Sequence, residues 1–234
     1  MPTKVPLVAS SLIVFFAFTF FSYTVAKETW QKRDFDTTVK LQDHISRRFD
    51  ESFSYFTYLG SIELTVGVAL ILALLSLSRK KFLAFLGWLI ILPASFFEVF
   101  GKLVVFHPSP PEFLHRNILA TTLPSFYVHT NFSYPSGHMT RTIFLVVTFA
   151  MIVWVSKRNA FSKLISLSTL LVFAFFMALT RVYLGEHWLS DVIGGILLGL
   201  ASGLFASALI IGKNTVKMNK VRADAIKESA ALGR

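Results

Sequence analysis

Six long apolar runs limit the fold of this chain more than any other feature. Each is long enough to cross a bilayer as a helix, which takes about 20 apolar residues. The runs lie at about residues 5–26, 55–77, 82–106, 138–155, 161–180 and 188–211. Hydrophobic residues make up 54% of the 234-residue chain and charged residues only 15%, which is typical of membrane proteins. The sequence therefore predicts an all-α integral membrane bundle of six transmembrane helices, with residues 1–234 forming a single domain.

The first apolar run follows Lys4, so it also fits a secretory signal peptide. However, it is longer than the usual apolar region of such a peptide, and no small-x-small cleavage site follows it cleanly. We therefore interpret it as an uncleaved first transmembrane helix.

The basic residues indicate how the helices are oriented, because cytoplasmic loops of membrane proteins are enriched in Lys and Arg. If the N-terminus is cytoplasmic, the cytoplasmic segments contain Lys4, Arg79, Lys80, Lys81, Lys157, Arg158, Lys163, Lys213, Lys217, Lys220, Arg222, Lys227 and Arg234. In the first outer loop, bases and acids are equal in number. The net charge of +10 thus reflects topology and not a nucleic-acid partner. The sequence predicts a multi-pass cell-membrane protein with both termini cytoplasmic and a basic tail, residues 213–234, lying against anionic lipid.

The segment between the first two runs has apolar residues at mostly helical spacing and charged residues on the other face. The apolar positions are Phe35, Val39, Ile45, Phe49 and Phe53. This pattern is typical of a short helix lying in the outer membrane interface. An ordinary extension of the second transmembrane helix fits the pattern equally well.

Two transmembrane runs contain residues that indicate packing inside the bundle. The third run includes Pro93 and Glu98, both tolerated in a membrane helix where they face other helices. The sixth run carries Gly195, Gly199 and Gly203, a spacing that lets two helices approach closely.

Polar residues capable of chemistry gather on one membrane face in the predicted topology. His187 and Asp191 are four residues apart at the start of the sixth run, so they share a helix face. A carboxylate behind an imidazole fixes the tautomer of the ring and stabilises the cation formed in a reaction. Arg181 adds a forked cation suited to phosphate. The same residues also fit an interfacial hydrogen bond beside an arginine that extends to the membrane surface.

The stretch Pro135–His138 ends a long outer loop, at residues 107–135, and begins the fourth run. Ser136 is a natural helix N-cap, and Gly137 lets backbone approach a ligand closely. The free N–H groups of a helix start can bind an anion, and His138 could donate a proton to a leaving oxygen. Taken alone, these four residues also fit a capped helix with an interfacial histidine.

An anion-binding helix start, two histidines, an aspartate and several cations together indicate a site for phosphoryl transfer. In these residues the sequence resembles the type 2 phosphatidic acid phosphatases, which are six-helix membrane lipid phosphatases of the haloperoxidase-related superfamily. Their Pro-Ser-Gly-His motif matches fully at Pro135–His138. Their Ser-Arg-x5-His-x3-Asp motif matches at Thr180 to Asp191, with threonine in place of serine. Their Lys-x6-Arg-Pro motif matches at Lys102 to Pro110, except that Ser109 replaces the arginine.

The resemblance implies a role for each matched residue. His187 would attack phosphorus and form a phosphohistidine, Asp191 would orient it, and His138 would protonate the leaving group. The residues that would hold the phosphate oxygens are Lys102, Ser136, Gly137 and Arg181. The implied substrate is a membrane lipid phosphate or diphosphate in the bilayer, with the active site on the extracytoplasmic side.

The resemblance also implies that no metal or other cofactor is needed. The chain contains no cysteine, which excludes disulfides, zinc–thiolate sites and thiol nucleophiles. No clear cluster of carboxylates suggests a metal site either.

Ser109 cannot supply the charge or the bidentate fork of the arginine it replaces. We hypothesise that Arg141, three residues beyond His138, or Arg116, in the outer loop, completes the phosphate clamp. Alternatively, these arginines bind lipid headgroups or surface carboxylates. For the other histidines, we expect hydrogen bonds within loops or the interface; they are His44, His107, His115 and His129.

Two further functions remain open on sequence grounds. A member of the same family could transfer the phosphoryl group to an acceptor other than water. A degenerate relative without the motif arginine could bind anionic lipid and catalyse nothing. The intact set of His138, His187 and Asp191 favours catalysis.

Overall fold

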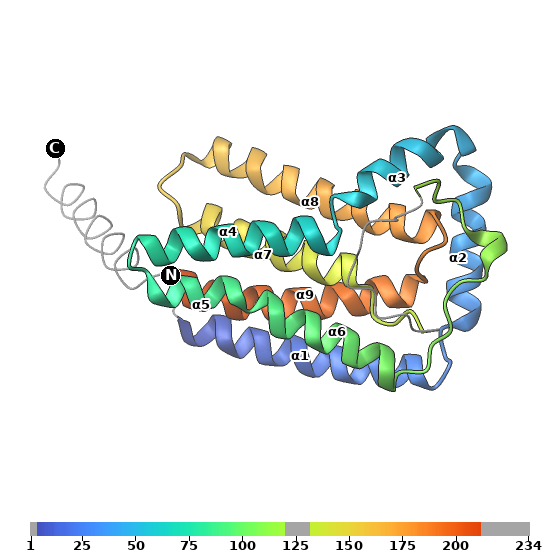
Figure 1. Cartoon of the computed structure of the whole chain (residues 1–234), viewed down its shortest axis with the longest axis horizontal. Coiled ribbons are helices and arrows are strands. Elements are labelled where there is room, and N and C mark those ends of the chain that lie inside the picture. The colour runs from blue at the N-terminus through green and yellow to red at the C-terminus, as the bar shows by residue number, and fades with distance from the viewer. Residues whose placement is uncertain (1–3, 120–131, 212–234) are drawn as a thin grey trace, which may run out of the picture.

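The computed structural model describes residues 4–119 and 132–211, and this part of the chain is helical, with no strand among the described residues (Figure 1). The elements are α1 Lys4–Ala26, α2 Gln31–His44, α3 Asp50–Tyr58, α4 Ile62–Ser78, α5 Phe82–Leu89, α6 Ile91–Val104, α7 Gly137–Val155, α8 Ala160–Tyr183 and α9 Leu189–Ile210, with short 3₁₀ turns at Arg47–Phe49 and Glu112–Leu114. The predicted basic tail, residues 213–234, lies outside the described residues.

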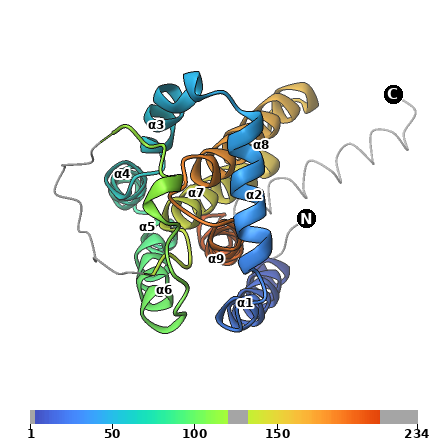
Figure 2. The ribbon, with the colours of Figure 1, turned by 90° about the vertical axis from the view of Figure 1, so that its right-hand side faces the viewer.

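Within the described residues, six stretches of helix are long and apolar enough to cross a membrane, as predicted. They run side by side along the long axis of the molecule, with α9 in the middle (Figures 1 and 2). In the most apolar stretch of α9, half of the residues are buried, whereas in those of α1 and α8 only 17% are buried. The bundle is therefore built around α9, and α1 and α8 present most of their surface to the surroundings.

The second and third spans are each interrupted. The second predicted run begins in α3, and α4 starts only at Ile62, where the Ser61 side chain accepts a hydrogen bond from the Leu64 N–H. The third run is divided into α5 and α6 at Ile90. Pro93 explains the second break, because it lacks an N–H group and its ring clashes with the carbonyl four residues earlier, that of Leu89.

Helix α2 crosses the end of the bundle at a steep angle to the spans (Figures 1 and 2). It ends at His44, before the second span begins, so it is a separate interfacial helix and not an extension of that span. The face of α2 turned to the bundle carries Asp34 and Thr38, both buried, whereas Phe35 is exposed. We call this end of the bundle the site end.

The glycine spacing in α9 allows close packing against α7, as predicted. A Cβ atom on Gly195 would lie 2.5 Å from the Ser136 carbonyl oxygen, and one on Gly199 would lie 2.6 Å from that of Thr140. The two backbones therefore touch directly, which fixes the start of α7 relative to the start of α9.

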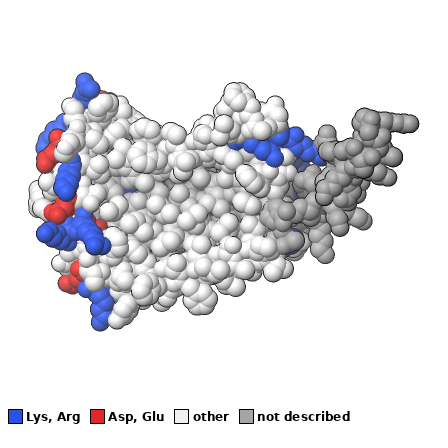
Figure 3. Space-filling view, turned by 180° about the vertical axis from the view of Figure 1, so that it is seen from behind, with Lys and Arg blue, Asp and Glu red and all other residues white. Residues whose placement is uncertain are grey.

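On the face shown in Figure 3, the charged side chains are concentrated at the two ends of the bundle. On the face shown there, Lys, Arg, Asp and Glu side chains mix at the site end, and Lys and Arg side chains gather near the opposite end. An uncharged belt separates them, and exposed large apolar side chains occur along the spans, including Phe16, Ile71, Phe96 and Leu171. Such a belt is what a bilayer requires, and the protein is a multi-pass membrane protein.

Candidate active site

Three segments that are distant in sequence meet beneath α2 at the site end. They are the end of α6 with the loop after it, the start of α7, and the link from α8 to α9. The Ser136 N–H donates to the Asp191 carbonyl at 3.0 Å, and the Trp188 indole N–H donates to the Pro108 carbonyl at 2.8 Å. These contacts hold the three segments together at the site end.

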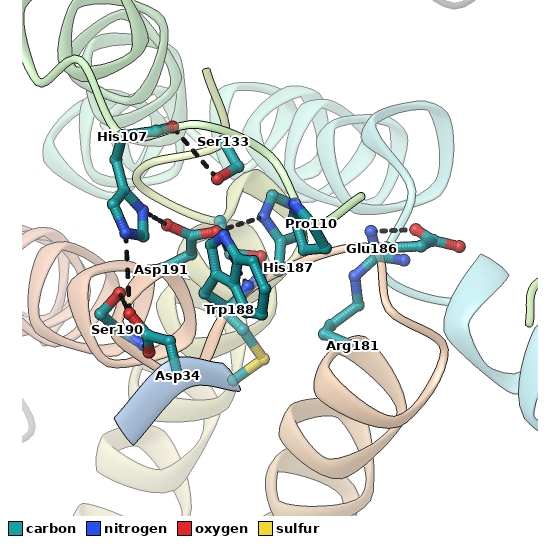
Figure 4. Close-up of polar contacts among 12 residues, drawn as sticks. Asp34, His107, Pro110, Ser133, Arg181, Glu186, His187, Trp188, Ser190 and Asp191 are labelled. Carbon is teal, nitrogen blue, oxygen red and sulfur yellow. Dashed lines mark hydrogen bonds and ion pairs between the residues drawn. The ribbon is translucent and has the colours of Figure 1, made fainter. Parts of the chain in front are cut away.

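His187 and Asp191 form the predicted pair. The Nδ1 atom of His187 lies 3.3 Å from Oδ2 of Asp191 (Figure 4). The prediction that His187 and Asp191 share a helix face was wrong, because His187 precedes α9. Trp188 is the N-cap of α9, and its N–H donates to the same Oδ2 atom at 3.0 Å. In the described part of the chain, Nε2 of His187 has no hydrogen-bond partner.

The surroundings of His187 favour the neutral imidazole. Burial is the main cause that lowers the pKa of His187 below its usual value. The hydrogen bond and charge of Asp191 oppose this shift, and the positive charges of Arg181 and Lys102 reinforce it. A neutral ring hydrogen-bonded through Nδ1 keeps a lone pair on Nε2.

The expectation for His107 was wrong, because this histidine contacts the candidate site and not only its own loop. Its Nδ1 atom lies 3.0 Å from Oδ1 of Asp191, the oxygen that His187 does not use. On its other side, Nε2 lies 3.6 Å from Oδ2 of Asp34, on α2 (Figure 4). Asp34 in turn accepts hydrogen bonds from the N–H and hydroxyl groups of Ser190, at 2.8 and 2.7 Å.

The sequence interpretation also missed Asp34. The only local signal is that Asp34 lies on a different face of the predicted interfacial helix from Phe35. His107 gave a signal too, since it lies inside the segment that matches the first family motif, Lys102 to Pro110.

The Pro-Ser-Gly-His stretch turns into α7 as predicted. Ser136 is the N-cap, and its hydroxyl accepts a long hydrogen bond of 3.5 Å from the Met139 N–H. A Cβ atom at Gly137 would lie 2.5 Å from Oε1 of Glu98, so a larger residue there would displace that carboxylate. The His138 side chain makes no hydrogen bond to any residue in the described part of the chain, and its ring faces Gly60, whose Cβ would lie 3.1 Å from it.

Glu98 gathers three of the predicted phosphate-binding residues. Its carboxylate accepts from the Lys102 ammonium at 2.8 Å, the pairing expected from their spacing, and from Nη1 of Arg141 at 2.7 Å. Both carboxylate oxygens also pack against Gly137. Arg141 is therefore tied to the candidate site through Glu98, which the sequence interpretation did not foresee.

Arg181, in the last turn of α8, is almost fully buried. Its guanidinium donates to the Thr57 hydroxyl at 2.8 Å and pairs with the Glu186 carboxylate. The Nε atoms of Arg181 and Arg141 are buried without a hydrogen-bond partner among the described residues. The charged or ionisable groups that act on the His138 ring are Arg181, Arg141, His187 and Lys102. The two histidines and the three cations thus form one cluster.

Arg116 lies on a different set of contacts from the other candidate phosphate ligands. Its guanidinium donates to the Tyr183 hydroxyl at 3.1 Å and packs on the ring of that tyrosine. Ser109 is exposed. His44 and His115 form the local contacts expected of them, with the carbonyls of Lys40 and Pro110. His129 lies outside the described residues.

No group of three or more His, Asp or Glu side chains is arranged to hold a metal ion within residues 4–119 and 132–211. The His187, Asp191, His107 and Asp34 side chains form a row in which each contacts the next, as Figure 4 shows, and they do not converge on one point.

Comparisons with known proteins agree with the motifs. Among solved structures, the chain is similar to the first transmembrane PAP2-type phosphatidylglycerolphosphate phosphatase from Bacillus subtilis, with 21% identity and a TM-score of 0.64 over 85% of this chain and 93% of that one. It is also similar to LpxE from Aquifex aeolicus, with 21% identity and a TM-score of 0.53 over 74% of this chain and 93% of that one. At this identity the likeness shows a shared fold. A comparison with curated proteins gives no match.

A model of one protein family covers the site. The model described as the PAP2 superfamily matches residues 81–214, which is more than half of the chain and includes all three motif segments. The resemblance seen in the sequence is confirmed: the chain belongs to the PAP2 superfamily.

Proposed function

We propose that the protein hydrolyses a phosphate monoester or diphosphate on a membrane lipid, without a metal ion, through a phosphohistidine at His187. The observation that carries the proposal is the His187–Asp191 pair, joined through Nδ1 at 3.3 Å. This pairing leaves Nε2 available for attack, and the positive charges of Arg181 and Lys102 act on the same ring. Such a nucleophile and orienting carboxylate are the usual basis of covalent catalysis.

The reaction has two steps. In the first, the Nε2 lone pair of His187 attacks phosphorus, the bond from phosphorus to the lipid oxygen breaks, and His138 gives its proton to that oxygen. In the second, His138 takes a proton from water, the water oxygen attacks phosphorus, and the bond from nitrogen to phosphorus breaks. Free phosphate leaves, and both histidines regain their starting protonation states.

The buried arginine nitrogens support a phosphate position at this cluster. A buried donor without a partner costs about 1–3 kcal/mol, and both Nε atoms of Arg141 and Arg181 are in this condition within the described residues. Phosphate oxygens are acceptors suited to guanidinium groups. Arg181 and Lys102 would therefore hold the phosphate, with Ser136 and Gly137 at the start of α7.

Arg141 is the stronger candidate to replace the motif arginine that is missing at Ser109. Its Nη1 atom is held by Glu98, and its Nε atom remains without a partner in the described part of the chain. Arg116 stays a candidate with less support, because it packs on Tyr183. Turnover of Arg141→Ala and Arg116→Ala tests this idea. We expect a loss of about 10- to 1,000-fold in kcat/KM, the range of one or two lost charge-assisted bonds in a transition state, for at least one of them. Near-normal turnover in both would refute it.

The topology proposed from the basic residues places the site end on the extracytoplasmic side. The N-terminal end of α1 and the C-terminal end of α9 lie at the opposite end of the bundle (Figure 1). Cytoplasmic termini would then put Arg79, Lys80 and Lys81 on the cytoplasmic side, in agreement with the usual bias of Lys and Arg. The lipid headgroup would reach the site laterally from the outer leaflet.

The experiment that tests the function is phosphate release from a panel of lipid phosphates and diphosphates by purified protein in detergent, with a chelator present. We expect release from at least one lipid, and abolition of that release in His187→Ala. His44→Ala, at an exposed histidine on α2, serves as the matched control and should behave as wild type. No release from any lipid would overturn the proposal, and loss on chelation would overturn the metal-independent mechanism.

A second measurement tests the intermediate. Protein incubated with a lipid labelled with ³²P at its phosphate should carry label that survives alkali and is lost in acid, as expected of a phosphohistidine. His187→Ala should carry none. If the label instead accumulates on a second lipid or a glycan, the protein is a phosphoryl transferase of the same family.

A further inference from the structure

Asp191 contacts a histidine through each of its carboxylate oxygens. Oδ2 lies 3.3 Å from Nδ1 of His187, and Oδ1 lies 3.0 Å from Nδ1 of His107. The far nitrogen of His107 lies 3.6 Å from the carboxylate of Asp34. The four side chains therefore form an unbroken row from the interfacial helix α2 to the candidate nucleophile (Figure 4).

The row is buried along its whole length. Asp191 has no exposed surface, Asp34 is 1% exposed and His107 is 4% exposed. Two hydrogen bonds from Ser190, at the first turn of α9, fix the Asp34 carboxylate. The His107 backbone is fixed as well, because its carbonyl accepts from the Ser133 N–H at 3.0 Å. Neither His107 nor Asp34 can therefore leave the row without breaking other contacts.

Carboxyl and imidazole groups alternate along the row. Burial alone would lower the pKa of His107, but the hydrogen bond to Asp191 and then the charges of Asp191, Asp34 and Glu28 outweigh it and raise that pKa above its usual value. His107, which lies between the two carboxyl groups, therefore holds its proton more strongly than an ordinary histidine. Burial raises the pKa of Asp34, and the Ser190 hydrogen bonds and the charge of His107 oppose this shift.

We propose that His107 and Asp34 are positioning residues that act through Asp191 on His187, the nucleophile of the reaction proposed above, on which this inference rests. His107 holds one oxygen of Asp191 so that the other stays on Nδ1 of His187. Asp34 offsets the charge of His107, so that the row as a whole keeps the single negative charge of an isolated aspartate.

That negative charge matters during the attack on phosphorus. As Nε2 of His187 forms its bond to phosphorus, the imidazole becomes positive, and its Nδ1 proton stays in the hydrogen bond to Asp191. A cation beside Asp191 without Asp34 would weaken the stabilisation of this charge. The two outer residues thus have opposite electrostatic effects on His187, although each also contributes packing.

This opposition gives a test that a purely structural role cannot satisfy. His107→Gln removes a positive charge near Asp191, so His187 should protonate more easily and its pKa should rise. Asp34→Asn removes a negative charge, so the pKa of His187 should fall. We expect His107 to stay protonated on the acidic side of neutrality in the Asp34→Asn variant, because the hydrogen bond and charge of Asp191 raise its pKa more than the charge of Asp34 does. The other ionisable groups that act on His187, Arg181 and Lys102, stay the same in both variants.

The measurement is the titration of His187 by NMR of ¹⁵N-histidine-labelled protein in detergent, together with the pH profile of kcat/KM for phosphate release. We expect the NMR titration and the acidic limb of the profile to move to higher pH in His107→Gln and to lower pH in Asp34→Asn. We also expect kcat to fall about 10- to 100-fold with little change in KM, the range found when a partner that orients a metal-ligating side chain is removed. The matched controls are Asp43→Asn and His44→Gln, at exposed positions of the same helix, and both should titrate and turn over as wild type.

Shifts in the same direction, or lower activity without any shift, would overturn the proposal and leave His107 and Asp34 as structural contacts. If either variant does not fold, the wild type still decides, because His107 must carry protons on both nitrogens at a pH just above the usual histidine pKa of about 6.5. A neutral His107 at that pH overturns the proposal. If the wild type releases no phosphate from any lipid, the hydrolase function fails, whereas the NMR titrations still decide whether the row controls His187.

Discussion

Glu98 is a buried carboxylate that pairs with two cations near the site, so its loss should destabilise the bundle. Its carboxylate is 6% exposed and accepts two charged donors, Arg141 at 2.7 Å and Lys102 at 2.8 Å. Glu98→Ala would leave both cations without a partner. A hydrogen bond to a charged group contributes about 1.5–3 kcal/mol to stability. The loss of both bonds to Glu98 should therefore cost at most about twice that amount.

The two cations should not contribute equally to this cost. The Lys102 side chain is 21% exposed and can turn toward water, whereas the Arg141 side chain is 6% exposed. Most of the cost therefore comes from the uncompensated guanidinium. We expect Glu98→Ala to lower the free energy of unfolding by about 3–5 kcal/mol, as for other buried ion pairs that lose one partner.

Unfolding of the purified protein in mixed micelles of mild detergent and SDS measures this free energy. The matched control is Glu63→Ala, at an exposed glutamate in the first turn of α4, which should lose less than about 1 kcal/mol. Replacing the partner in the same chain, Glu98→Ala with Arg141→Met, should recover part of the loss, because the unpaired buried charge is then gone. A loss in Glu98→Ala no larger than in the control would refute the reasoning.

Three more outcomes follow from packing and charge. Gly199→Ala should lower the free energy of unfolding by about 1–3 kcal/mol, since its Cβ would lie 2.6 Å from the Thr140 carbonyl oxygen. The control Gly67→Ala, with no atom within 4 Å of its Cβ, should be neutral or stabilising. Equal effects of the two substitutions in SDS unfolding would contradict the close packing of α7 and α9. In the pH profile of kcat/KM, the acidic limb should have its midpoint below the usual histidine pKa of about 6.5, because burial lowers the pKa of His187 and the neutral nucleophile persists at lower pH. A midpoint above that value in phosphate-release assays would count against His187 as nucleophile. Because its pKa is raised in the fold, the ionic contribution of His107 to stability should be complete below the unfolded pKa and lost as pH rises through the folded one; a stability gap between wild type and His107→Gln that widens with rising pH would be inconsistent with this.

Local spacing predicted much of the fold and part of the site. The apolar runs identified all six spans because a bilayer imposes their length. The contact between Glu98 and Lys102 follows from a separation of four residues, which places two side chains on one helical turn. His187 and Asp191 are also four residues apart, but His187 precedes α9, so their contact depends in addition on the turn that ends at Trp188. The glycine spacing in α9 predicted its close packing, although it did not identify α7 as the partner.

The unpredicted contacts are those between residues far apart in sequence. Asp34 and Ser190 are separated by 156 positions, His107 and Asp191 by 84, and Glu98 and Arg141 by 43. No periodicity connects such pairs, because their contact depends on how α2 crosses the bundle and how α6 packs against α7. His107 was therefore interpreted from its own loop, and Arg141 without its carboxylate partner.

The direct backbone contact between α7 and α9 has a consequence for how this protein can diverge. The two helices carry or adjoin His138 and His187, and the Ser136 N–H bonded to the Asp191 carbonyl ties their first turns together. The distance between the two reacting groups is thus set by backbone contacts at glycine residues. Substitutions of side chains elsewhere leave these contacts intact. The outward surfaces of α1 and α8 contribute little to that frame, so substitutions there can adapt the protein to membranes of different thickness or lipid content while the chemistry stays the same.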